Sequence, residues 1–340
     1  MEDIQSFRVM GILSRARTLE SQGRTIIHME IGEPEFPTPE PVVTAAIEAL
    51  RAGETHYTPA LGLPDLREAI AAYYRQRDGI EVDPQRIIIT PGSSGALLLA
   101  LGVLIDPGER VLMSDPGYPC NRHFVRLLEG VAAGIAVGAE TEYQLNAELI
   151  EGHWRERTRA VMLASPANPT GAVIPEHKLR EIVYTVERLG GALIMDEIYL
   201  DLVYGQRPRS VLALSDAVFV VNSFSKFFNM TGWRIGWLVA PEDFVSPVDR
   251  LAQNIFLAAS TPAQHAALKA FGKGTLGILE QHRQALQQRR DYLLPALRDI
   301  GFTVEAHPAG AFYIYAGCDR FTQDSQAFCR DLLEQAGVAI

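Results

Sequence analysis

Residues 86–103 read RIIITPGSSGALLLALGV, and this stretch decides the class of fold that the sequence predicts. Three isoleucines followed by a threonine favour a short buried strand over 86–90, because β-branched side chains suit a pleated surface. A proline and a glycine end that strand, and Ser93 or Ser94 can cap a helix that runs to about Val103. A strand that passes directly into a helix is typical of the units that build parallel sheets.

The same alternation of short apolar strands and helices continues along the chain to about residue 240. Further strands are predicted over 111–114, 160–164, 192–195, 218–222 and 235–240. Helical periodicity covers 119–128 and 176–189 between them. Apolar strands joined by helices indicate an α/β fold, in which a mostly parallel sheet is covered by helices on both faces.

The two ends of the chain have a different pattern, in which long helices dominate. Helices are predicted over 4–22, 276–300 and 325–336, with short strands over 302–305 and 311–315. We therefore expect two domains: a large sheet domain over 40–245, and a smaller α+β domain that combines 1–39 with 246–340. A chain of 340 residues suits this division, since single cores stop growing near about 250–300 residues.

Composition and charge describe an ordinary globular protein and exclude several classes of function. Hydrophobic residues make up 47% of the chain and charged residues 21%, which is enough to bury a large core. With 31 Lys and Arg against 41 Asp and Glu the formal net charge is −10, and there is no basic run, so nucleic acids and membrane surfaces are not expected partners. An acidic protein can still hold one small phosphate through a local arginine.

The cysteines and the first residues predict a compartment. Cys120, Cys318 and Cys329 lie far apart, show no zinc-ligand spacing and suit a reducing environment. The N-terminal stretch is polar and helically patterned, unlike a signal peptide, and no apolar run approaches the ~20 residues of a membrane span. We therefore expect a cytoplasmic protein without a metal site.

Polar side chains follow several of the predicted strands at the point where each strand ends. They are Ser93, Ser94, Tyr118, Asn168, Asp196, Tyr199, Ser223, Ser225 and Lys226. Because the carboxyl ends of parallel strands meet at one edge of a sheet, these side chains indicate a small-molecule site there. The glycine patterns of dinucleotide and nucleoside triphosphate sites do not occur. Serines at the start of a helix would instead cradle a single phosphate, although an ordinary helix cap explains them as well.

Residues 222–237, NSFSKFFNMTGWRIGW, give the strongest indication of a reactive side chain. A single lysine, Lys226, lies among three phenylalanines, and desolvation by apolar side chains lowers a lysine pKa and makes the amine a nucleophile toward carbonyls. Arg234 and Ser223 are close enough in sequence to hold a phosphate beside it. A surface lysine after a strand is the alternative, and the apolar, tryptophan-flanked surroundings argue against it.

Two further stretches place polar groups at strand ends. In DEIY, which ends at Tyr199, the carboxyl group of Asp196 follows a buried strand and needs a partner such as a protonated ring nitrogen, while the tyrosine could reach a phenolate oxygen. In 165–171, SPANPTG, the amide of Asn168 can donate to a ring oxygen or a carboxylate. The alternative for DEIY is an acidic residue that ends a strand beside a core tyrosine. The alternative for SPANPTG is a plain turn.

Taken in order, these motifs resemble those of the class I/II pyridoxal-phosphate-dependent aminotransferases, the fold-type-I family. The matching motifs are IGEP (31–34), HYTP (56–59), TPGSSGA (90–96), DPGY (115–118), NPTG (168–171), DEIY (196–199), SFSK (223–226) and GWR (232–234). They follow the family's order over nearly the whole chain, which a chance match does not explain. The resemblance implies that 40–245 is the cofactor-binding domain.

The resemblance also implies a role for each residue singled out above. Lys226 corresponds to the lysine that forms a Schiff base with pyridoxal phosphate and moves a proton between substrate and cofactor. Asp196 corresponds to the acid that keeps the ring nitrogen protonated, so that the ring accepts electrons. Asn168 and Tyr199 correspond to donors to the ring 3′-oxygen, and Tyr118 to an aromatic side chain stacked on the ring.

The phosphate and substrate contacts follow from the same resemblance. The phosphate cup corresponds to Ser93, Ser94, Ser223 and Arg234. Tyr57 corresponds to a tyrosine that reaches the cofactor phosphate of the neighbouring subunit, which implies a homodimer with shared active sites. The backbone N–H of Gly32, together with Asn168, corresponds to contacts with the substrate. Residues near Phe7 and Ile12 are expected to border the substrate side chain.

The C-terminal end departs from the family pattern. Members of the family continue into a strand pair that carries an arginine, which grips the substrate carboxylate with two hydrogen bonds. Here the sequence ends at Ile340, where that strand is expected to begin, and neither Arg320 nor Arg330 has the expected context. We expect that the chain lacks this segment and that substrate binding is weakened by about 2–5 kcal/mol, the cost of one lost buried charge partner.

The expected activity is transfer of an amino group from an amino acid to a 2-oxo acid by ping-pong chemistry through Lys226. A C–S β-lyase or a racemase-like enzyme would use the same lysine, and the motifs do not separate these reactions. A non-catalytic, ligand-binding relative is a further alternative, although no basic helix-turn-helix precedes the match. An assembled but poorly active protein is another alternative. No arginine marks a pocket for a second carboxylate, so aromatic, aliphatic and alanine-type donors stay open.

Overall fold

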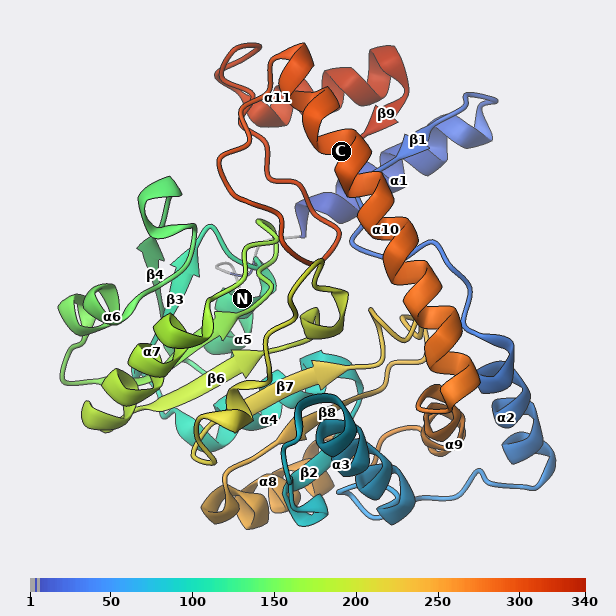
Figure 1. Cartoon of the computed structure of the whole chain (residues 1–340), viewed down its shortest axis with the longest axis vertical. Helices are drawn as coiled ribbons and strands as arrows, with labels where there is room; N and C mark the ends of the chain where they lie inside the picture. The colour runs from blue at the N-terminus through green and yellow to red at the C-terminus, as the bar shows by residue number, and fades with distance from the viewer. Residues whose placement is uncertain (1–3, 5–6) are drawn as a thin grey trace.

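A seven-stranded sheet forms the centre of the molecule (Figure 1). The computed structural model describes residue 4 and residues 7–340 of the chain. The strands of this sheet are β2 (Ile87–Thr90), β3 (Arg110–Asp115), β4 (Val131–Ala136), β5 (Thr158–Ala164), β6 (Ala192–Asp196), β7 (Phe219–Ser223) and β8 (Gly236–Val239). Their order is β2-β8-β7-β6-β5-β3-β4, and all run in the same direction except β8, which is antiparallel to both neighbours. The predicted mostly parallel sheet is confirmed.

Both faces of the sheet are buried, because alternate side chains along each strand enter two different hydrophobic clusters. On β6, Leu193 and Met195 pack into one cluster and Ile194 into the other. On β2, Ile88 faces the second cluster while its two neighbours face the first. Strands that are buried on both faces need no polar side, which explains the continuous apolar runs in the sequence.

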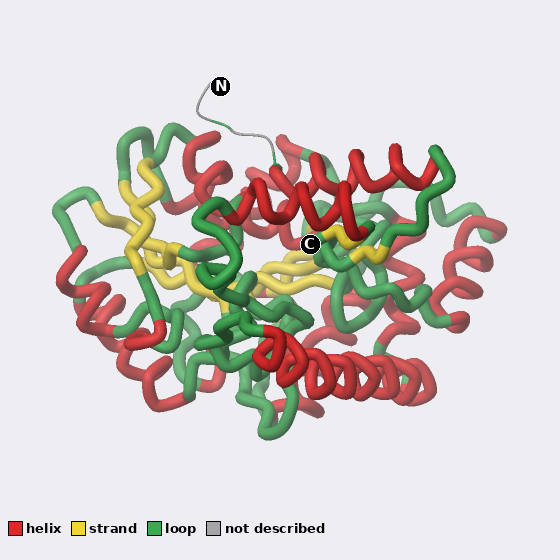
Figure 2. The backbone as a smooth tube through the Cα atoms, turned by 90° about the horizontal axis from the view of Figure 1, so that it is seen from above, coloured by secondary structure: helices red, strands yellow, loops and turns green. Residues whose placement is uncertain are grey.

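Helices cover the two faces of the sheet in two groups (Figure 2). One face carries α4 (Gly92–Leu104), α5 (Cys120–Leu127) and α8 (Glu242–Ile255). The other face carries α3 (Pro64–Asp78), α6 (Ala147–His153), α7 (Glu176–Arg188) and α9 (Thr261–Ala270), and α2 (Glu40–Arg51) packs on α9. Short 3-10 turns lie at Pro84–Arg86, Ala139–Thr141, Leu200–Leu202 and Val211–Ala213. In the described part of the chain, every helix is too short or too polar to cross a membrane.

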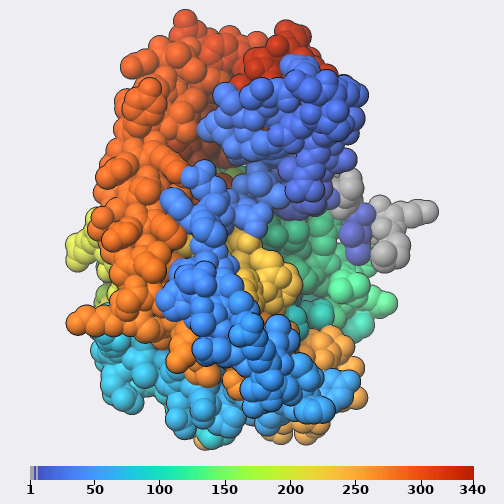
Figure 3. Space-filling view, turned by 90° about the vertical axis from the view of Figure 1, so that its right-hand side faces the viewer, coloured from blue at the N-terminus to red at the C-terminus, as the bar shows by residue number. Residues whose placement is uncertain are grey.

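The two ends of the chain meet beside the sheet. Helix α1 (Arg8–Ser21) leads to β1 (Ile27–His28), which pairs in parallel with β9 (Val338–Ala339). The long helix α10 (Lys273–Ile300) and then α11 (Ser325–Asp331) and a π-helical turn (Leu332–Ala336) carry the chain to that pairing. Side chains from both ends share a small core, and Figure 3 shows the blue N-terminal segments against the orange and red C-terminal ones. The division at residues 40 and 245 stays a prediction.

The strands predicted over 302–305 and 311–315 are absent from the described structure, and that prediction is wrong. The two stretches form only isolated bridges, Thr303 with Gly317 and, just before the second stretch, Gly310 with Val203. The backbone near Ala311 bonds to loops of the sheet domain instead of forming a ladder. Alternating apolar residues here reflect contact with another part of the molecule and not membership of a sheet.

Two other local features differ from the prediction. Helix α4 begins at Gly92 with Pro91 in the cap position, so Ser93 and Ser94 lie in the first turn and do not cap the helix. Strand β4 is not predicted by its sequence, VAAGIA, because alanine and glycine have low strand propensity. Its pairing with β3 along the edge of the sheet overrides that local preference.

Candidate active site

A cavity of about 520 Å³ opens where the central strands end. Residues singled out from the sequence that line it are Phe7, Gly32, Ser93, Ser94, Tyr118, Asn168, Asp196, Tyr199, Ser225, Lys226 and Arg234. They come from segments far apart in the chain, and the parallel arrangement of β2, β5, β6 and β7 brings most of them together. The edge of the sheet that the sequence indicated is therefore the place where these side chains converge.

Lys226 lies just after β7, where the chain turns back toward β8. Its Nζ atom donates to the backbone carbonyl of Gly32 over 2.5 Å and lies 5.8 Å from the centre of the Phe312 ring. Burial lowers the pKa of Lys226 from 10.5 to about 8; Glu33 opposes this shift and Arg234 adds to it. Near neutral pH a larger fraction of this amine is neutral and nucleophilic than of an exposed lysine.

Asp196 is the last residue of β6, and its carboxyl group is buried. One carboxylate oxygen accepts a hydrogen bond from the N–H of Ile198 over 3.0 Å. Burial raises the pKa of Asp196 from 3.8 to about 6, although the Ile198 hydrogen bond and the charge of Lys226 both act to lower it. A protonated heterocycle against this carboxylate would offset the cost of burial and stabilise both charges.

Residues of the first turn of α4, Ser225 and Arg234 also line the cavity. Because no side chain caps α4, the N–H groups of its first turn and the positive end of its dipole are available to an anion. Gly92 has a φ of +69°, and a Cβ atom there would lie 2.6 Å from Arg234 Nη2. Glycine thus lets the guanidinium approach the helix start closely, and the combination suits a phosphate group.

The hydroxyl group of Tyr313 lies between two of the predicted ring-oxygen donors. It is 2.7 Å from the Tyr199 hydroxyl and 3.2 Å from the Asn168 amide nitrogen. A Cβ atom on Gly32 would lie 2.2 Å from the same hydroxyl, so only glycine fits there. Burial raises the pKa of Tyr313 from 10.0 to about 12, so the phenol stays protonated. Sequence reasoning missed Tyr313, since nothing local indicates that its segment returns to the cavity.

Three residues that the sequence analysis singled out do not line the cavity, namely Ser223, Tyr57 and Ile12. The Ser223 hydroxyl is buried behind Ser225, to whose hydroxyl it donates over 2.8 Å, and Ser225 is the one that lines the cavity. Tyr57 is 83% exposed on the surface of the single chain. Of the two N-terminal residues, Phe7 lines the cavity, whereas Ile12 packs against the small core formed by the chain ends.

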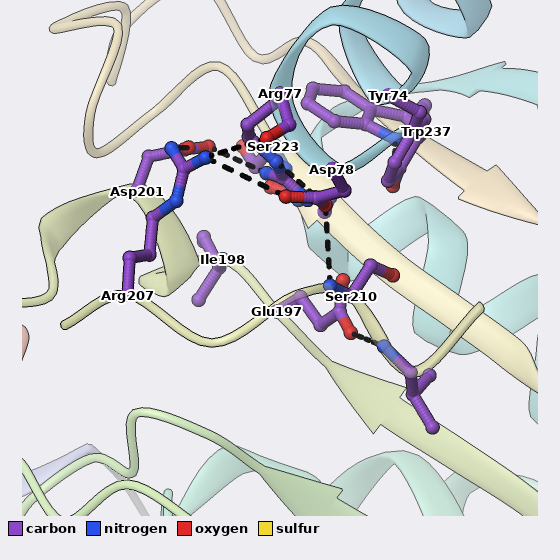
Figure 4. Close-up of polar contacts among 12 residues, drawn as sticks. Tyr74, Arg77, Asp78, Glu197, Ile198, Asp201, Arg207, Ser210, Ser223 and Trp237 are labelled. Atoms are coloured by element: carbon purple, nitrogen blue, oxygen red, sulfur yellow. Dashed lines mark hydrogen bonds and ion pairs between the residues drawn. The ribbon is translucent and has the colours of Figure 1, made fainter. Parts of the chain in front are cut away.

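A buried network of charges joins α3 to the segment that follows β6 (Figure 4). Arg77 donates to Asp78 over 2.5 Å and to Asp201 over 3.0 Å, and the three side chains are at most 5% exposed. Arg207 forms further ion pairs with the same two aspartates. Buried ion pairs of this kind fix the relative position of the segments that carry them, because breaking one pair leaves an uncompensated charge.

Glu197 extends this polar region directly beside Asp196. One oxygen of Glu197 accepts from the N–H of Val211 over 2.7 Å, while the other is buried without a hydrogen-bond partner among the described residues. Burial raises the pKa of Glu197 from 4.5 to about 7, partly offset by the charge of Arg77. The neighbouring acidic residues of DEIY therefore have different surroundings, since Asp196 lines the cavity and Glu197 does not.

Comparison with known proteins agrees with this geometry. The chain matches the family model "Aminotransferase class I and II" over residues 24–340. It is 40% identical to a valine–pyruvate aminotransferase of Mycobacterium tuberculosis, and the match covers 99% of this chain and 87% of the relative. It is 37% identical to a (5-formylfuran-3-yl)methyl phosphate transaminase of Methanocaldococcus jannaschii, and that match covers 99% of this chain and 88% of the relative. The crystal structure of an aminotransferase from Mycobacterium tuberculosis superposes with a TM-score of 0.96 at 39% identity, covering 100% of this chain and 88% of the other.

The chain therefore belongs to the aminotransferase class I and II family. It is a pyridoxal-phosphate-dependent enzyme of fold type I that transfers amino groups between amino acids and 2-oxo acids. The family, cofactor and class of reaction predicted from the sequence are confirmed.

Proposed function

We propose that the cavity is the cofactor site and that different residues in it bind different parts of the cofactor. The first turn of α4 with Ser93 and Ser94, Ser225 and Arg234 hold the phosphate, while Ser223 supports Ser225 from behind. Asp196 faces the ring nitrogen. The donor set supports this assignment, because helix-start N–H groups and a guanidinium lie together beside Gly92, and a buried carboxylate lines the same cavity, which suits the charges of the cofactor.

Each remaining residue then has a task that its surroundings suit. When bound, pyridoxal phosphate supplies a carbonyl carbon for amines and a ring that withdraws electrons from the substrate Cα. Lys226 provides the amine that binds the cofactor covalently, and its Nζ later takes the proton from the substrate Cα. Asn168 and Tyr199 donate to the ring 3′-oxygen, and Tyr118 covers a ring face. The backbone N–H of Gly32 is left for the substrate carboxylate.

We further propose that the amino donor has a neutral side chain. Phe7, Val9 and Ile31 line the cavity. Among the described lining residues the only cations are Lys226 and Arg234, and both have roles toward the cofactor. A second substrate carboxylate would therefore find no spare positive partner. The relative that is named for valine and pyruvate, at 40% identity, supports an aliphatic or aromatic donor.

The test is to mix the cofactor-loaded protein with one amino acid at a time and to measure the matching 2-oxo acid by mass spectrometry. Valine, leucine and phenylalanine should form their oxo acids faster than aspartate. Aspartate as the best donor would contradict the proposed specificity. Pyruvate and ammonia from a cysteine conjugate, without oxo acid from any donor, would indicate a C–S β-lyase. Bound cofactor with no product from any amino acid would indicate a ligand-binding protein.

We also propose that the enzyme works as a cytoplasmic homodimer. Tyr57 is exposed, and the preceding helix α2 exposes Ile47 and Leu50, so this surface is apolar enough to pack against a second copy. A tyrosine that contributes to the neighbour's phosphate site explains why a single chain leaves it outside the cavity. Light scattering should give twice the 37.5 kDa chain mass, and a monomer with full cofactor affinity would contradict the proposal. Three free cysteines suit a reducing compartment.

A further inference from the structure

The Tyr313 hydroxyl contacts both groups that the proposed function assigns to the cofactor's ring oxygen. The Asn168 amide nitrogen lies 3.2 Å away and the Tyr199 hydroxyl 2.7 Å away. An amide NH₂ group only donates, so the Tyr313 oxygen accepts in the first of these bonds and has a further lone pair and its own proton for the second. One phenol oxygen therefore satisfies two side chains whose shared partner is otherwise the cofactor.

Backbone contacts hold the Tyr313 segment in this place. The N–H of Gly310 donates to the carbonyl of Gly171 over 3.0 Å, and the N–H of Ala311 donates to the carbonyl of Leu202 over 3.0 Å. The first bond ties the segment to the loop that carries Asn168, and the second ties it to the turn that follows Tyr199. Ala311 has a φ of +58°, which a residue with a Cβ atom adopts only when its surroundings impose it.

We propose that the hydroxyl of Tyr313 takes the place of the cofactor's ring oxygen in the cofactor-free site. It bonds to Asn168 and Tyr199 while the site is free, and it gives up both bonds when the cofactor enters. This inference rests on the proposed function, because it requires Asn168 and Tyr199 to bind the ring oxygen. The hydroxyl then competes with the cofactor for the same two donors.

Whether removing the Tyr313 hydroxyl strengthens or weakens cofactor binding depends on the other contacts that hold Asn168 and Tyr199. The Tyr199 ring is buried and packs edge-to-face against Phe312 at 5.5 Å between ring centres, so it keeps its place without the Tyr313 hydroxyl. The loop of Asn168 is closed by hydrogen bonds from Gly171 N–H to Ala167 O and from Ala167 N–H to Ala172 O. Removing the hydroxyl therefore removes the competitor and leaves the donors in position.

The experiment compares Tyr313→Phe with wild type and with Tyr315→Phe, a control in the same segment that lies outside the cavity and packs on Tyr143. Each protein is freed of cofactor with hydroxylamine and titrated with pyridoxal phosphate, and fluorescence quenching gives the dissociation constant. We expect the constant of Tyr313→Phe to fall by about three- to tenfold, the scale of one net hydrogen bond, and that of Tyr315→Phe to stay unchanged. Urea unfolding of the cofactor-free proteins checks that the variants are folded.

The experiment distinguishes failure of this inference about Tyr313 from failure of the proposed function. If wild type binds the cofactor and Tyr313→Phe binds it equally or more weakly, the inference is overturned and the proposed function stands. If wild type does not bind pyridoxal phosphate, the proposed function fails and the inference fails with it. A lower dissociation constant in Tyr315→Phe as well would also overturn the inference, because the effect would then not belong to the hydroxyl in the site.

Discussion

Lys226 and Gly32 are 194 positions apart in the sequence, yet the Nζ atom of Lys226 donates to the Gly32 carbonyl over 2.5 Å. The amine at the end of β7 is thereby held by the segment that leaves β1, and this segment also packs against the Tyr313 hydroxyl. This contact joins the flexible lysine side chain to a backbone segment that is distant in the sequence. Several properties of the site depend on this arrangement.

Replacing Lys226 with alanine should abolish covalent attachment of the cofactor, because Lys226 supplies the buried amine that lines the cavity. Borohydride reduction followed by peptide mass spectrometry should find the cofactor mass on the Lys226 peptide of wild type and on no peptide of the variant. Lys273→Ala, at the exposed start of α10, is the matched control and should label as wild type does. A labelled peptide elsewhere in the Lys226 variant would assign the chemistry to a different lysine.

The rate at which cofactor-free protein captures pyridoxal phosphate should increase with pH up to about 8 and then level off. Only the neutral amine attacks a carbonyl, and burial lowers the pKa of Lys226 from 10.5 to about 8. Stopped-flow absorbance between about pH 6 and 10 measures this profile, and an unperturbed lysine would keep accelerating to about pH 10.4. A rate that still climbs at the top of that range would show that the amine is not desolvated.

Gly92→Ala should weaken cofactor binding by at least about tenfold, since the new Cβ atom would displace the Arg234 guanidinium and Gly92 has a positive φ. Gly277→Ala is the control, because a Cβ atom there meets nothing within 4 Å and alanine favours its helix. Equilibrium dialysis gives both affinities. Equal losses in the two variants, or none in Gly92→Ala, would remove Arg234 from the phosphate site.

Glu197→Gln should change how stability depends on pH without touching the cavity. Burial raises the pKa of Glu197 from 4.5 to about 7, so the folded state binds more protons between these values. The associated stability is fully present below about pH 4.5 and is lost as the pH rises toward 7, with a slope of up to about 1.4 kcal/mol per pH unit. Urea unfolding at a series of pH values measures the slope in cofactor-free protein.

The glutamine variant should lose that part of the slope, because it keeps an acceptor for the Val211 N–H and cannot ionise. Asp196, whose pKa is raised to about 6, contributes in the lower part of the window in both proteins, so the difference between them is the quantity of interest. Gly277→Ala, which changes no ionisable side chain, should leave the slope as it is. Identical slopes in wild type and Glu197→Gln would show that Glu197 stays ionised in the folded protein.

Tyr57→Phe should weaken cofactor affinity by about fivefold, the scale of one hydrogen bond, while cofactor attachment to Lys226 persists. The reason is that the exposed Tyr57 hydroxyl is expected to reach the phosphate of the second subunit. Tyr184→Phe, which is 67% exposed on α7, is the control. Unchanged affinity in Tyr57→Phe would remove the argument for shared sites and leave the oligomeric state to light scattering alone.

The sheet could be predicted because its strands are buried on both faces, so that apolar runs such as 87–89 mark each strand and the strand ends mark the site. Lys226 and Asp196 could be found for the same reason. Tyr313 could not be found, since its position is set by backbone bonds from Gly310 and Ala311 to distant loops and not by local pattern. Ser225 differs from Ser223 only in the direction that its side chain takes after β7, and sequence spacing carries no information about that.

The pairing of β1 with β9 has a consequence for the order in which the protein is completed during synthesis. The strands of the large sheet lie between residues 87 and 239 and can pair once they have left the ribosome, whereas residues 27–28 must wait for residues 338–339. Gly32, which holds the Lys226 amine, follows β1 directly. All strands of the large sheet can therefore pair before the segment that contacts the Lys226 amine gains its partner strand.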